Sequence, residues 1–335
     1  MIKKKCCFIV PYFGKLPKQF PVFLKTCANN TEFDWLIFTD DYSEFNYPKN
    51  VMPKYMSFND LREIIKNKFE FEIKLEQPYK LCDYKPAYGY IFEEYLNNYS
   101  FWGHCDIDTL MGDLNTFLTN DLLNKYDKLF CLGHMIIYKN TYENNRIFQS
   151  PLNGKEIYKE SFSTDKITFF DETYGTNENI NTIFKSLNKK VLEEDWSINF
   201  SVLPTIFHKT TYNSSQNDFI IENDTNFLYI WDKGHIFRYF KKDGSIKREE
   251  FLYMHLQERQ MRYSQRILNL NNFKIVPNSF LELEVDKIEI NSFDNVKKNA
   301  FNMHLFKFHL KWKIRKIKRI LKRLTKLGIN SRREN

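Results

Sequence analysis

The amino-acid sequence predicts an α/β fold in which helices flank a mixed sheet, followed by an antiparallel part and a basic amphipathic C-terminal helix. Short apolar segments alternate with segments of helical periodicity over roughly the first 110 residues, as in parallel sheets covered on both faces. Strand-like segments joined by tight turns follow between residues 226 and 256. Residues 303–335 hold twelve Lys or Arg and one Glu, whereas the other 302 residues carry 38 basic and 41 acidic residues.

The composition is that of a globular protein. Of the 335 residues, 42% are hydrophobic and 17% are aromatic, which argues against wholesale disorder. We expect one domain over residues 1–295 and a tail helix over residues 296–335. The N-terminal apolar run spans about five residues, and no segment approaches the ~20 apolar residues of a membrane-spanning helix. A cytoplasmic location is therefore expected, with the six cysteines, which lack C-x-x-C spacing, as mostly buried thiols.

In the first half, the predicted elements follow one another as strands and helices. Apolar runs end at Pro or at acidic residues, and the segments between them repeat apolar residues at helical spacing. In chain order they are a strand at 5–10, a helix at 17–30, a strand at 33–41, helices at 59–69 and 85–99, and a strand at 100–108. Ligands of such sheets bind beyond the carboxyl ends of the strands, here residues 11–14, 39–41 and 106–108.

The second half has a different pattern. Residues 128–140 are strand-like and residues 178–188 are helix-like. Residues 226–256 predict three antiparallel strands, with turns at 232–234 and 243–244, so the sheet is expected to be mixed. Residues 296–328 predict one long helix.

The segment FWGHCDIDTLMGDL (101–114) brings two carboxylates to the end of a buried strand. Asp106 and Asp108 lie two residues apart, so on an extended segment their side chains point the same way and can meet one divalent cation. Mg²⁺ and Mn²⁺ prefer oxygen ligands and take further ligands from phosphates and water. The alternative is a turn that uses acids at a strand end. Asp113, which follows Gly112, is expected to cap a helix.

Three other segments carry candidate site residues. His255 at a strand end could be a third metal ligand through a neutral ring nitrogen, or an ordinary core or surface histidine. In LCDYKPAYG (81–89), Asp83 could bind a sugar hydroxyl and Lys85 a diphosphate, the alternative being a helix cap and a solvated lysine. In IVPYFGK (9–15), Tyr12 offers a ring for a base, and Gly14 allows close approach of the backbone.

Taken together, several segments resemble one family of bacterial glycosyltransferases from capsule and lipopolysaccharide gene clusters, most of whose members are uncharacterised. The segments are CDYKPAYGYIFEEYL, YSFWGHCDIDTLMGDL with its D-x-D motif, LGHMIIYKNT, WDKGHIFRYF and EEFLYMHLQER, with VPYFGKLP and WLIFTDD. The resemblance covers roughly residues 5–265. It implies a GT-A-like, Rossmann-like fold and a sugar transferase of the hexosyltransferase type. The donor would be a nucleotide-diphospho-sugar, which we expect to be a UDP-sugar, and the acceptor would be a glycan or a lipid-linked molecule.

The resemblance also implies a metal site and its ligands. Asp106 and Asp108 would hold Mn²⁺ or Mg²⁺ against the diphosphate of the donor, and His255 would complete the metal site. Asp106 would thereby also contact the nucleotide-sugar.

Other positions would hold the substrates. By the same resemblance, Tyr12 and Asp40 would bind the nucleoside, and Asp83 and Lys85 would face the donor sugar or its phosphates. His134 would lie near the acceptor.

An inverting transferase also needs a carboxylate base for the acceptor hydroxyl. Asp171 and Glu172 in one segment, and Glu194 and Asp195 in another, are the candidates. We favour Asp171 because it ends an apolar run, while a surface acid at the start of a loop is the alternative.

The tail predicts attachment to an anionic membrane. Apolar residues recur at helical spacing at 306, 310, 314, 317, 321 and 324, with Lys and Arg between them. Such a helix, over residues 303–328, would place the protein peripherally on the inner face of the cell membrane. A helix packed on the body is one alternative; nucleic acid is not expected as a partner because no nucleic-acid-binding fold accompanies the tail.

Two other functions remain open from the sequence. The same acids could serve a metal-dependent phosphohydrolase or nuclease with a basic nucleic-acid-binding tail. The chain could also be an inactive, membrane-associated binding protein.

Overall fold

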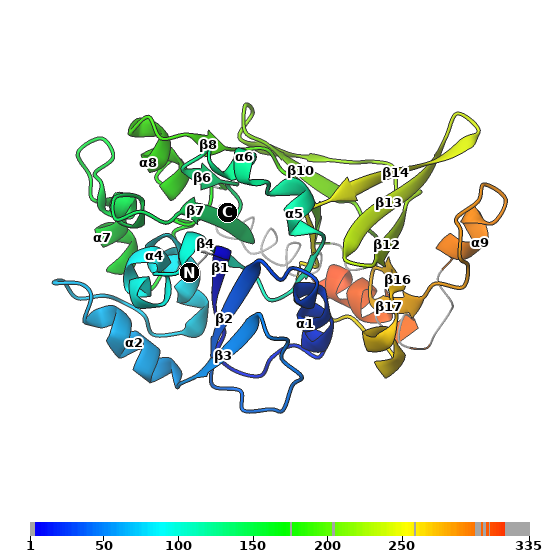
Figure 1. The fold of residues 1–335 in the computed structure, drawn as a ribbon, viewed down its shortest axis with the longest axis horizontal. Helices are drawn as coiled ribbons and strands as arrows, with labels where there is room; N and C mark the ends of the chain where they lie inside the picture. The colour runs from blue at the N-terminus through cyan, green and yellow to red at the C-terminus, as the bar shows by residue number, and fades with distance from the viewer. Residues whose placement is uncertain are drawn as a thin grey trace, which may run out of the picture.

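The computed structural model describes residues 4–318 except 175, 203, 204, 258, 299–302, 304, 305 and 308 (Figure 1). In this part of the chain, the strands form one seven-stranded sheet and two five-stranded sheets. Figure 1 shows the first sheet with its helices on one side of the molecule and the C-terminal sheet on the other.

The seven-stranded sheet has the order β3-β2-β1-β4-β7-β6-β8. Its strands are β1 (Lys4–Pro11), β2 (Phe33–Thr39), β3 (Val51–Tyr55), β4 (Tyr99–Cys105), β6 (Lys128–Leu129), β7 (Met135–Lys139) and β8 (Val191–Leu192). Strands β3, β2, β1 and β4 are parallel, an order found in Rossmann-like sheets, whereas β7 runs antiparallel to β4. The predicted mixed, Rossmann-like sheet is confirmed.

Strand β1 shows why this sheet is covered on both faces. Successive side chains of a strand point to opposite faces, and here Cys7 and Ile9 enter one buried apolar cluster while Phe8 and Val10 enter another. All seven residues of β2 are buried. A strand buried on both sides reads as a continuous apolar run, which is the pattern that predicted it.

Most of the helices belong to the part of the chain that forms this sheet, whereas α9 (Phe293–Lys297) packs against strand β12 (Leu228–Asp232) of the C-terminal sheet. Their bounds are α1 (Phe20–Ala28), α2 (Phe58–Lys66), α3 (Leu81–Tyr84), α4 (Tyr88–Ile91), α5 (Leu114–Phe117), α6 (Asn120–Leu123), α7 (Ile157–Phe162), α8 (Ile180–Ser186) and α9 (Phe293–Lys297), with 3₁₀ turns η1 (Pro78–Lys80), η2 (Lys85–Ala87), η3 (Glu93–Tyr95), η4 (Asn144–Gln149) and η5 (Gln265–Asn269). The prediction of a single helix at 85–99 is wrong, because η2, α4 and η3 occupy this segment as three short turns.

The prediction that Asp113 caps a helix is confirmed. Its carboxylate accepts a hydrogen bond from the Asn115 amide at the start of α5.

The two five-stranded sheets belong to the second half of the chain. One has the order β11-β10-β9-β15-β5 and the other β14-β13-β12-β16-β17. Their strands are β5 (Thr109–Met111), β9 (Ser197–Phe200), β10 (Lys209–Asn213), β11 (Asp218–Ile221), β12 (Leu228–Asp232), β13 (His235–Lys242), β14 (Ser245–Phe251), β15 (Tyr253–His255), β16 (Asn272–Val276) and β17 (Ser279–Glu282). The predicted antiparallel meander is confirmed as β12, β13 and β14.

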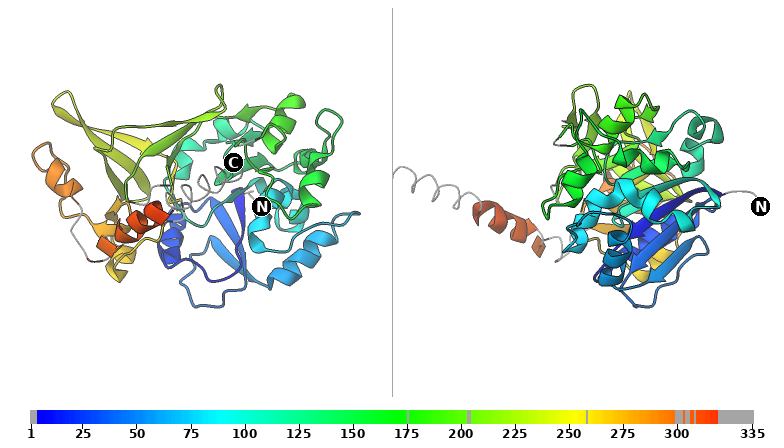
Figure 2. Two further views of the ribbon diagram at one scale, coloured as in Figure 1. Left: turned by 180° about the vertical axis from the view of Figure 1, so that it is seen from behind. Right: turned by 90° about the vertical axis from the view of Figure 1, so that its left-hand side faces the viewer.

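The C-terminal segment departs from the predicted continuous helix over 296–328. Helix α9 ends at Lys297, and Lys298 has a backbone ψ of 133°, which is extended rather than helical. Residues 303, 306, 307 and 309–318 are helical, and this segment projects from the body in the right-hand view of Figure 2. The predicted part beyond 318 lies outside the described residues. Along the described chain, no helix combines the length and the apolar character that crossing a membrane requires.

The cysteines behave as expected. All six are free thiols, and five are buried, while Cys82 is half-buried. Burial raises the pKa of the Cys6, Cys7 and Cys27 thiols, so these groups are protonated side chains of the core.

Substitution of Gly89 tests the packing of α4 against Trp102 of β4. A Cβ atom at this position would lie 2.3 Å from a ring carbon of Trp102, which is fully buried and stacked on Tyr138. We expect Gly89→Ala to lower the free energy of unfolding by about 1–3 kcal/mol, because the indole must move within a packed core. Chemical denaturation measures this loss.

The control for Gly89→Ala is the same substitution in a Trp102→Leu background. Leucine lacks the ring atoms that the new methyl group would meet, so the cost of Gly89→Ala should shrink there. If Gly89→Ala lowered the free energy of unfolding equally in both backgrounds, the contact with the Trp102 ring would not be the cause of the loss.

Candidate active site

The turn after β4 presents two carboxylates. Strand β4 is largely buried. A hydrogen bond from the Asp106 amide to the carbonyl of His134, at 3.0 Å, fixes the chain at the C-terminal end of this strand. The Thr109 hydroxyl then donates to the carbonyl of Asp106, at 2.7 Å, which closes the turn that carries Asp108. The turn therefore places Asp106 and Asp108 side by side at the start of β5.

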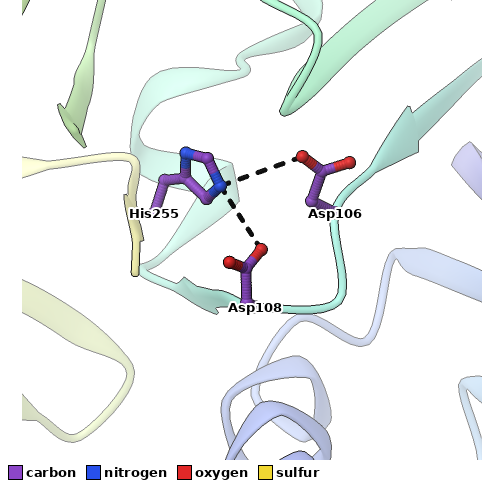
Figure 3. A group of neighbouring side chains, drawn as sticks. All are labelled: Asp106, Asp108 and His255. Atoms are coloured by element: carbon purple, nitrogen blue, oxygen red, sulfur yellow. Dashed lines mark ion pairs between the residues drawn. The ribbon is translucent and has the colours of Figure 1, made fainter. Parts of the chain in front are cut away.

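The pairing of β15 with β5 brings a histidine to this turn. In the antiparallel register, His255 lies opposite Thr109, and its side chain reaches back toward the two carboxylates (Figure 3). The Nε2 atom of His255 lies 3.3 Å from Asp108 Oδ1 and 3.8 Å from Asp106 Oδ2. One ligand atom from each of the three residues lies within 4.8 Å of the others.

Asn199 on β9 orients the imidazole ring. Its side-chain oxygen accepts from the Gln257 amide group at 2.9 Å and from the Phe200 amide at 3.0 Å, so this atom is an acceptor. The Nδ1 atom of His255 lies 3.2 Å from the same oxygen and therefore donates to it. The other ring nitrogen, Nε2, consequently faces the carboxylates, which is the arrangement that supports metal-ligating histidines.

The charges around His255 compensate one another. Burial disfavours the charged imidazolium, but the carboxylates of Asp108 and Asp106 outweigh it, and the pKa of His255 is raised above its ordinary value. The positive charge of the imidazolium and the negative charges of the two carboxylates thus stabilise one another.

Lys85 supplies a second cation to the same acids. Its ammonium donates to Asp106 Oδ1 and to the carbonyl of Gly133, both at 2.8 Å, and lies 3.6 Å from Asp171 Oδ2. Burial opposes its charge, yet the two carboxylates raise the pKa of Lys85 well above its ordinary value. Lys85 therefore links the D-x-D turn to Asp171.

Asp171 lies in an unusual environment for a carboxylate. It is buried, and burial raises its pKa to about 8 in spite of the opposing charge of Lys85. Burial likewise raises the pKa of the neighbouring Glu172, whose carboxylate accepts from the Gly133 amide at 3.0 Å. A carboxyl group with such a pKa can take up a proton near neutral pH.

These groups line one large cleft of about 2050 Å³. Six residues predicted for the site border it: Tyr12, Lys85, Asp106, Asp108, Asp171 and His255. His134 also borders it, with its Nδ1 bonded to the Tyr253 hydroxyl at 2.7 Å and its ring centroid 4.6 Å from that of His255.

Neither Asp40 nor Asp83 is among the residues that line the cleft. Asp40 accepts from the Gly14 amide at 2.7 Å and so shapes the loop that follows Tyr12. Asp83 is fully buried and pairs with Lys80 at 2.7 Å. Its oxygens also accept from the backbone amides of residues 168 and 170, so Asp83 braces the segment before Asp171 instead of facing a sugar.

Glu194 and Asp195 also lie away from the cleft lining. Glu194 accepts from the indole of Trp196 at 2.9 Å, and Asp195 accepts from the backbone amides of Ser197 and Tyr212. Of the four candidate bases, the structure places Asp171 and Glu172 in the cleft.

Two contributors to the site escaped the sequence prediction. Asn199, which orients His255, sits in a short strand with no motif around it. Arg259 borders the cleft and is buried, and its guanidinium donates to the carbonyls of Leu256 and Ser201. The basic segment after His255 was a signal for Arg259, whereas nothing in the sequence pointed to Asn199.

Comparisons with known proteins complete the description. No curated protein matches the chain. Solved structures with some likeness include the galactosyltransferase LgtC in complex with donor and acceptor sugar analogues, at 12% identity and a TM-score of 0.33, over 59% of this chain and 76% of that one. An active-site mutant of LgtC has the same identity and coverage with a TM-score of 0.34. Mouse xyloside xylosyltransferase 1, apo form, has 8% identity and a TM-score of 0.35, over 59% of this chain and 88% of that one.

Likeness of that extent bears on neither activity nor substrate. A family model, in contrast, matches residues 8–284, which is most of the chain and includes every residue of the cluster described above. The chain belongs to the family of unknown function DUF6625.

Proposed function

We propose that this protein is a metal-dependent glycosyltransferase with a GT-A-like site. It moves a sugar from a nucleotide-diphosphate donor, a UDP-sugar, to a glycan or lipid-linked acceptor in the synthesis of a cell-surface polysaccharide. The observation that carries the proposal is the cluster of Asp106, Asp108 and His255, whose ligand atoms lie within 4.8 Å of one another on a cleft large enough for two substrates.

The donor set of this cluster fits a divalent cation, Mn²⁺ or Mg²⁺. Two carboxylates supply hard oxygen ligands, and the bond to Asn199 leaves Nε2 of His255 as the nitrogen that faces them. The cluster is open to the cleft, so phosphate oxygens and water can supply further ligands. When bound, the cation would neutralise negative charge on the diphosphate leaving group.

Other residues of the cleft have roles that follow from their positions. Lys85 is a fixed cation beside Asp106, placed to attract the phosphates or polar groups of the donor sugar. Asp171, with its raised pKa, is the proposed base that takes the proton of the acceptor hydroxyl. Tyr12, at the end of β1, offers its ring to the base of the nucleotide.

The nuclease alternative has less support. Two-metal phosphoryl-transfer sites bring further carboxylates and histidines around a second ion. Within the described ranges, Asp106, Asp108 and His255 form the single group of this kind.

The apolar and basic residues of the tail support a peripheral location of the protein on the inner face of the cell membrane. Met303, Phe306, Leu310, Ile314 and Ile317 are spaced by three or four residues and are all exposed. The Lys and Arg residues between them suit anionic headgroups. We therefore propose that residues 303–328 bind an anionic membrane.

The first prediction from the proposed function concerns the cation cluster. Asp106→Asn, Asp108→Asn and His255→Ala should each weaken Mn²⁺-dependent binding of UDP by at least about tenfold, because each removes one ligand or its charge. Calorimetric titration with UDP in the presence and absence of Mn²⁺ measures this.

Asp113→Asn is the matched control for these variants. Asp113 lies in the same segment, but it caps α5, and Asn caps helices as well as Asp does. Its binding should equal that of the unmodified protein. Unchanged Mn²⁺-dependent binding in all three cluster variants would remove this cluster as the metal site.

The second prediction concerns pH. A proton and the cation compete for Nε2 of His255, and the carboxylates raise the pKa of this ring above its ordinary value of 6.5. The affinity for Mn²⁺ and UDP should therefore increase as the pH is raised through and above this value, with release of a proton on binding. Titrations in buffers of different ionisation enthalpy count the protons released.

In the His255→Ala variant, the release of this proton should disappear, although weak binding persists. The same proton count in the variant and the unmodified protein would show that His255 does not contact the cation.

The third prediction concerns the tail. Replacing both Leu310 and Ile314 by Glu should abolish binding to anionic phospholipid vesicles, because it charges the apolar face of the helix. Ile220→Glu, at an exposed apolar residue of the body, is the control and should leave binding intact. Vesicle flotation measures both, and equal flotation of the two proteins would contradict the proposed attachment.

A further inference from the structure

Phe169 is held in a conformation that bulky residues rarely adopt. Its backbone φ is +57°, in the left-handed region that favours glycine, and its side chain is 39% exposed. It also borders the cleft, two residues before Asp171. A strained residue at such a position calls for a functional reason.

The buried carboxylate of Asp83 is the structural cause of this backbone conformation. Asp83 accepts from the amides of Thr168 and Phe170 at 3.0 and 3.1 Å, so it fixes the residues on both sides of Phe169. The side chain of Phe170 points into the core and is fully buried. The backbone between these anchors turns Phe169 outward, and its ring is presented to the cleft.

Two more rings lie beside Phe169. Tyr174, which is 52% exposed, meets it edge to face with ring centroids 6.0 Å apart and an interplanar angle of 84°. The ring centroid of Phe219 lies 5.8 Å from that of Tyr174. All three border the cleft, and we call Phe169, Tyr174 and Phe219 the aromatic corner.

The aromatic corner is connected to the cation cluster through Asp171. Its segment leads into Asp171, which contacts Lys85 and through it Asp106. Tyr12 borders the same cleft, and burial and then the charge of Asp108 raise the pKa of its phenol.

The size of the cleft leaves room for a second substrate. Pockets for a single small ligand usually measure roughly 300–1,000 Å³. The cleft here, at about 2050 Å³, is much larger. A donor that contacts Tyr12 and the cation cluster would therefore not fill the whole cleft.

We infer that the aromatic corner is the acceptor subsite and binds a pyranose ring of a carbohydrate acceptor. This inference rests on the proposed function, which assigns Tyr12 and the cation cluster to the nucleotide donor. Pyranose rings have faces of C–H bonds, which suit the negative face of an aromatic ring. Their hydroxyl groups are donors, and the carboxylates of Asp171 and Glu172 border the same part of the cleft.

The test uses methyl glycosides of glucose, galactose and N-acetylglucosamine as probes, with binding followed by ligand-observed NMR in the presence of Mn²⁺ and UDP. Phe169→Gly and Tyr174→Ala should each weaken binding of the bound glycoside about three- to tenfold, the range expected for loss of one ring contact. Tyr142→Ala, at an exposed tyrosine outside the cleft lining, is the control and should bind as the unmodified protein does.

Thermal unfolding adds a second readout. Because glycine accepts a positive φ, Phe169→Gly should keep or raise the melting temperature while it weakens glycoside binding. Loss of binding with a lowered melting temperature, or equal loss in Tyr142→Ala, would contradict the inference.

The remaining outcomes separate this inference from the proposed function. If Mn²⁺-dependent UDP binding is present and both ring variants bind the glycoside unchanged, the aromatic corner is not the acceptor subsite, although the function stands. If UDP displaces the glycoside, the rings hold the nucleotide, and the inference is wrong. If UDP does not bind and the ring variants still lose the glycoside, a sugar-binding site remains and the transferase proposal fails.

Discussion

The site depends on the pairing of two three-residue strands, β15 and β5. They are far apart in the sequence, and their antiparallel register places His255 opposite Thr109, directly after the turn that carries Asp106 and Asp108. Strand β9 pairs with the other edge of β15 and contributes Asn199, which orients the imidazole. A shift of β15 by one residue would turn the His255 side chain to the opposite face of its sheet and dismantle the cluster.

Electrostatic compensation explains how two neighbouring carboxylates are tolerated at the end of a buried strand. Asp106 lies between two cations, with the Lys85 ammonium at one oxygen and the His255 ring near the other. A divalent cation would take the place of the proton on His255, which couples binding to pH. Lys85 extends the same network to Asp171, so the proposed base and the proposed cation site share one source of positive charge.

Strands β1, β2 and β4 of the parallel sheet were predictable because each is an apolar run with an interruption at its end. The D-x-D turn was predictable for the same reason, since two acids followed such a run. Strand β3 was not predicted, because its residues Val51–Tyr55 are mostly only partly buried and include Pro and Lys. Asp83 shows where this reasoning stops: an acid before a helix can face a ligand or the core, and only the three-dimensional position of Lys80 and of residues 168–170 decides between them. Asn199 and the strained Phe169 could not be predicted, because their roles arise from strand pairing and backbone conformation rather than from any local pattern.

The central claim is that the cleft binds a nucleoside diphosphate together with a divalent cation. A thermal-shift panel of UDP and other nucleoside diphosphates, each with and without Mn²⁺, tests it most directly on the full chain. We predict a rise in melting temperature that requires both components and is largest for UDP, because a cation held by Asp106, Asp108 and His255 would bind the phosphates. The same melting temperature with every nucleotide, in the presence and absence of Mn²⁺, would contradict it.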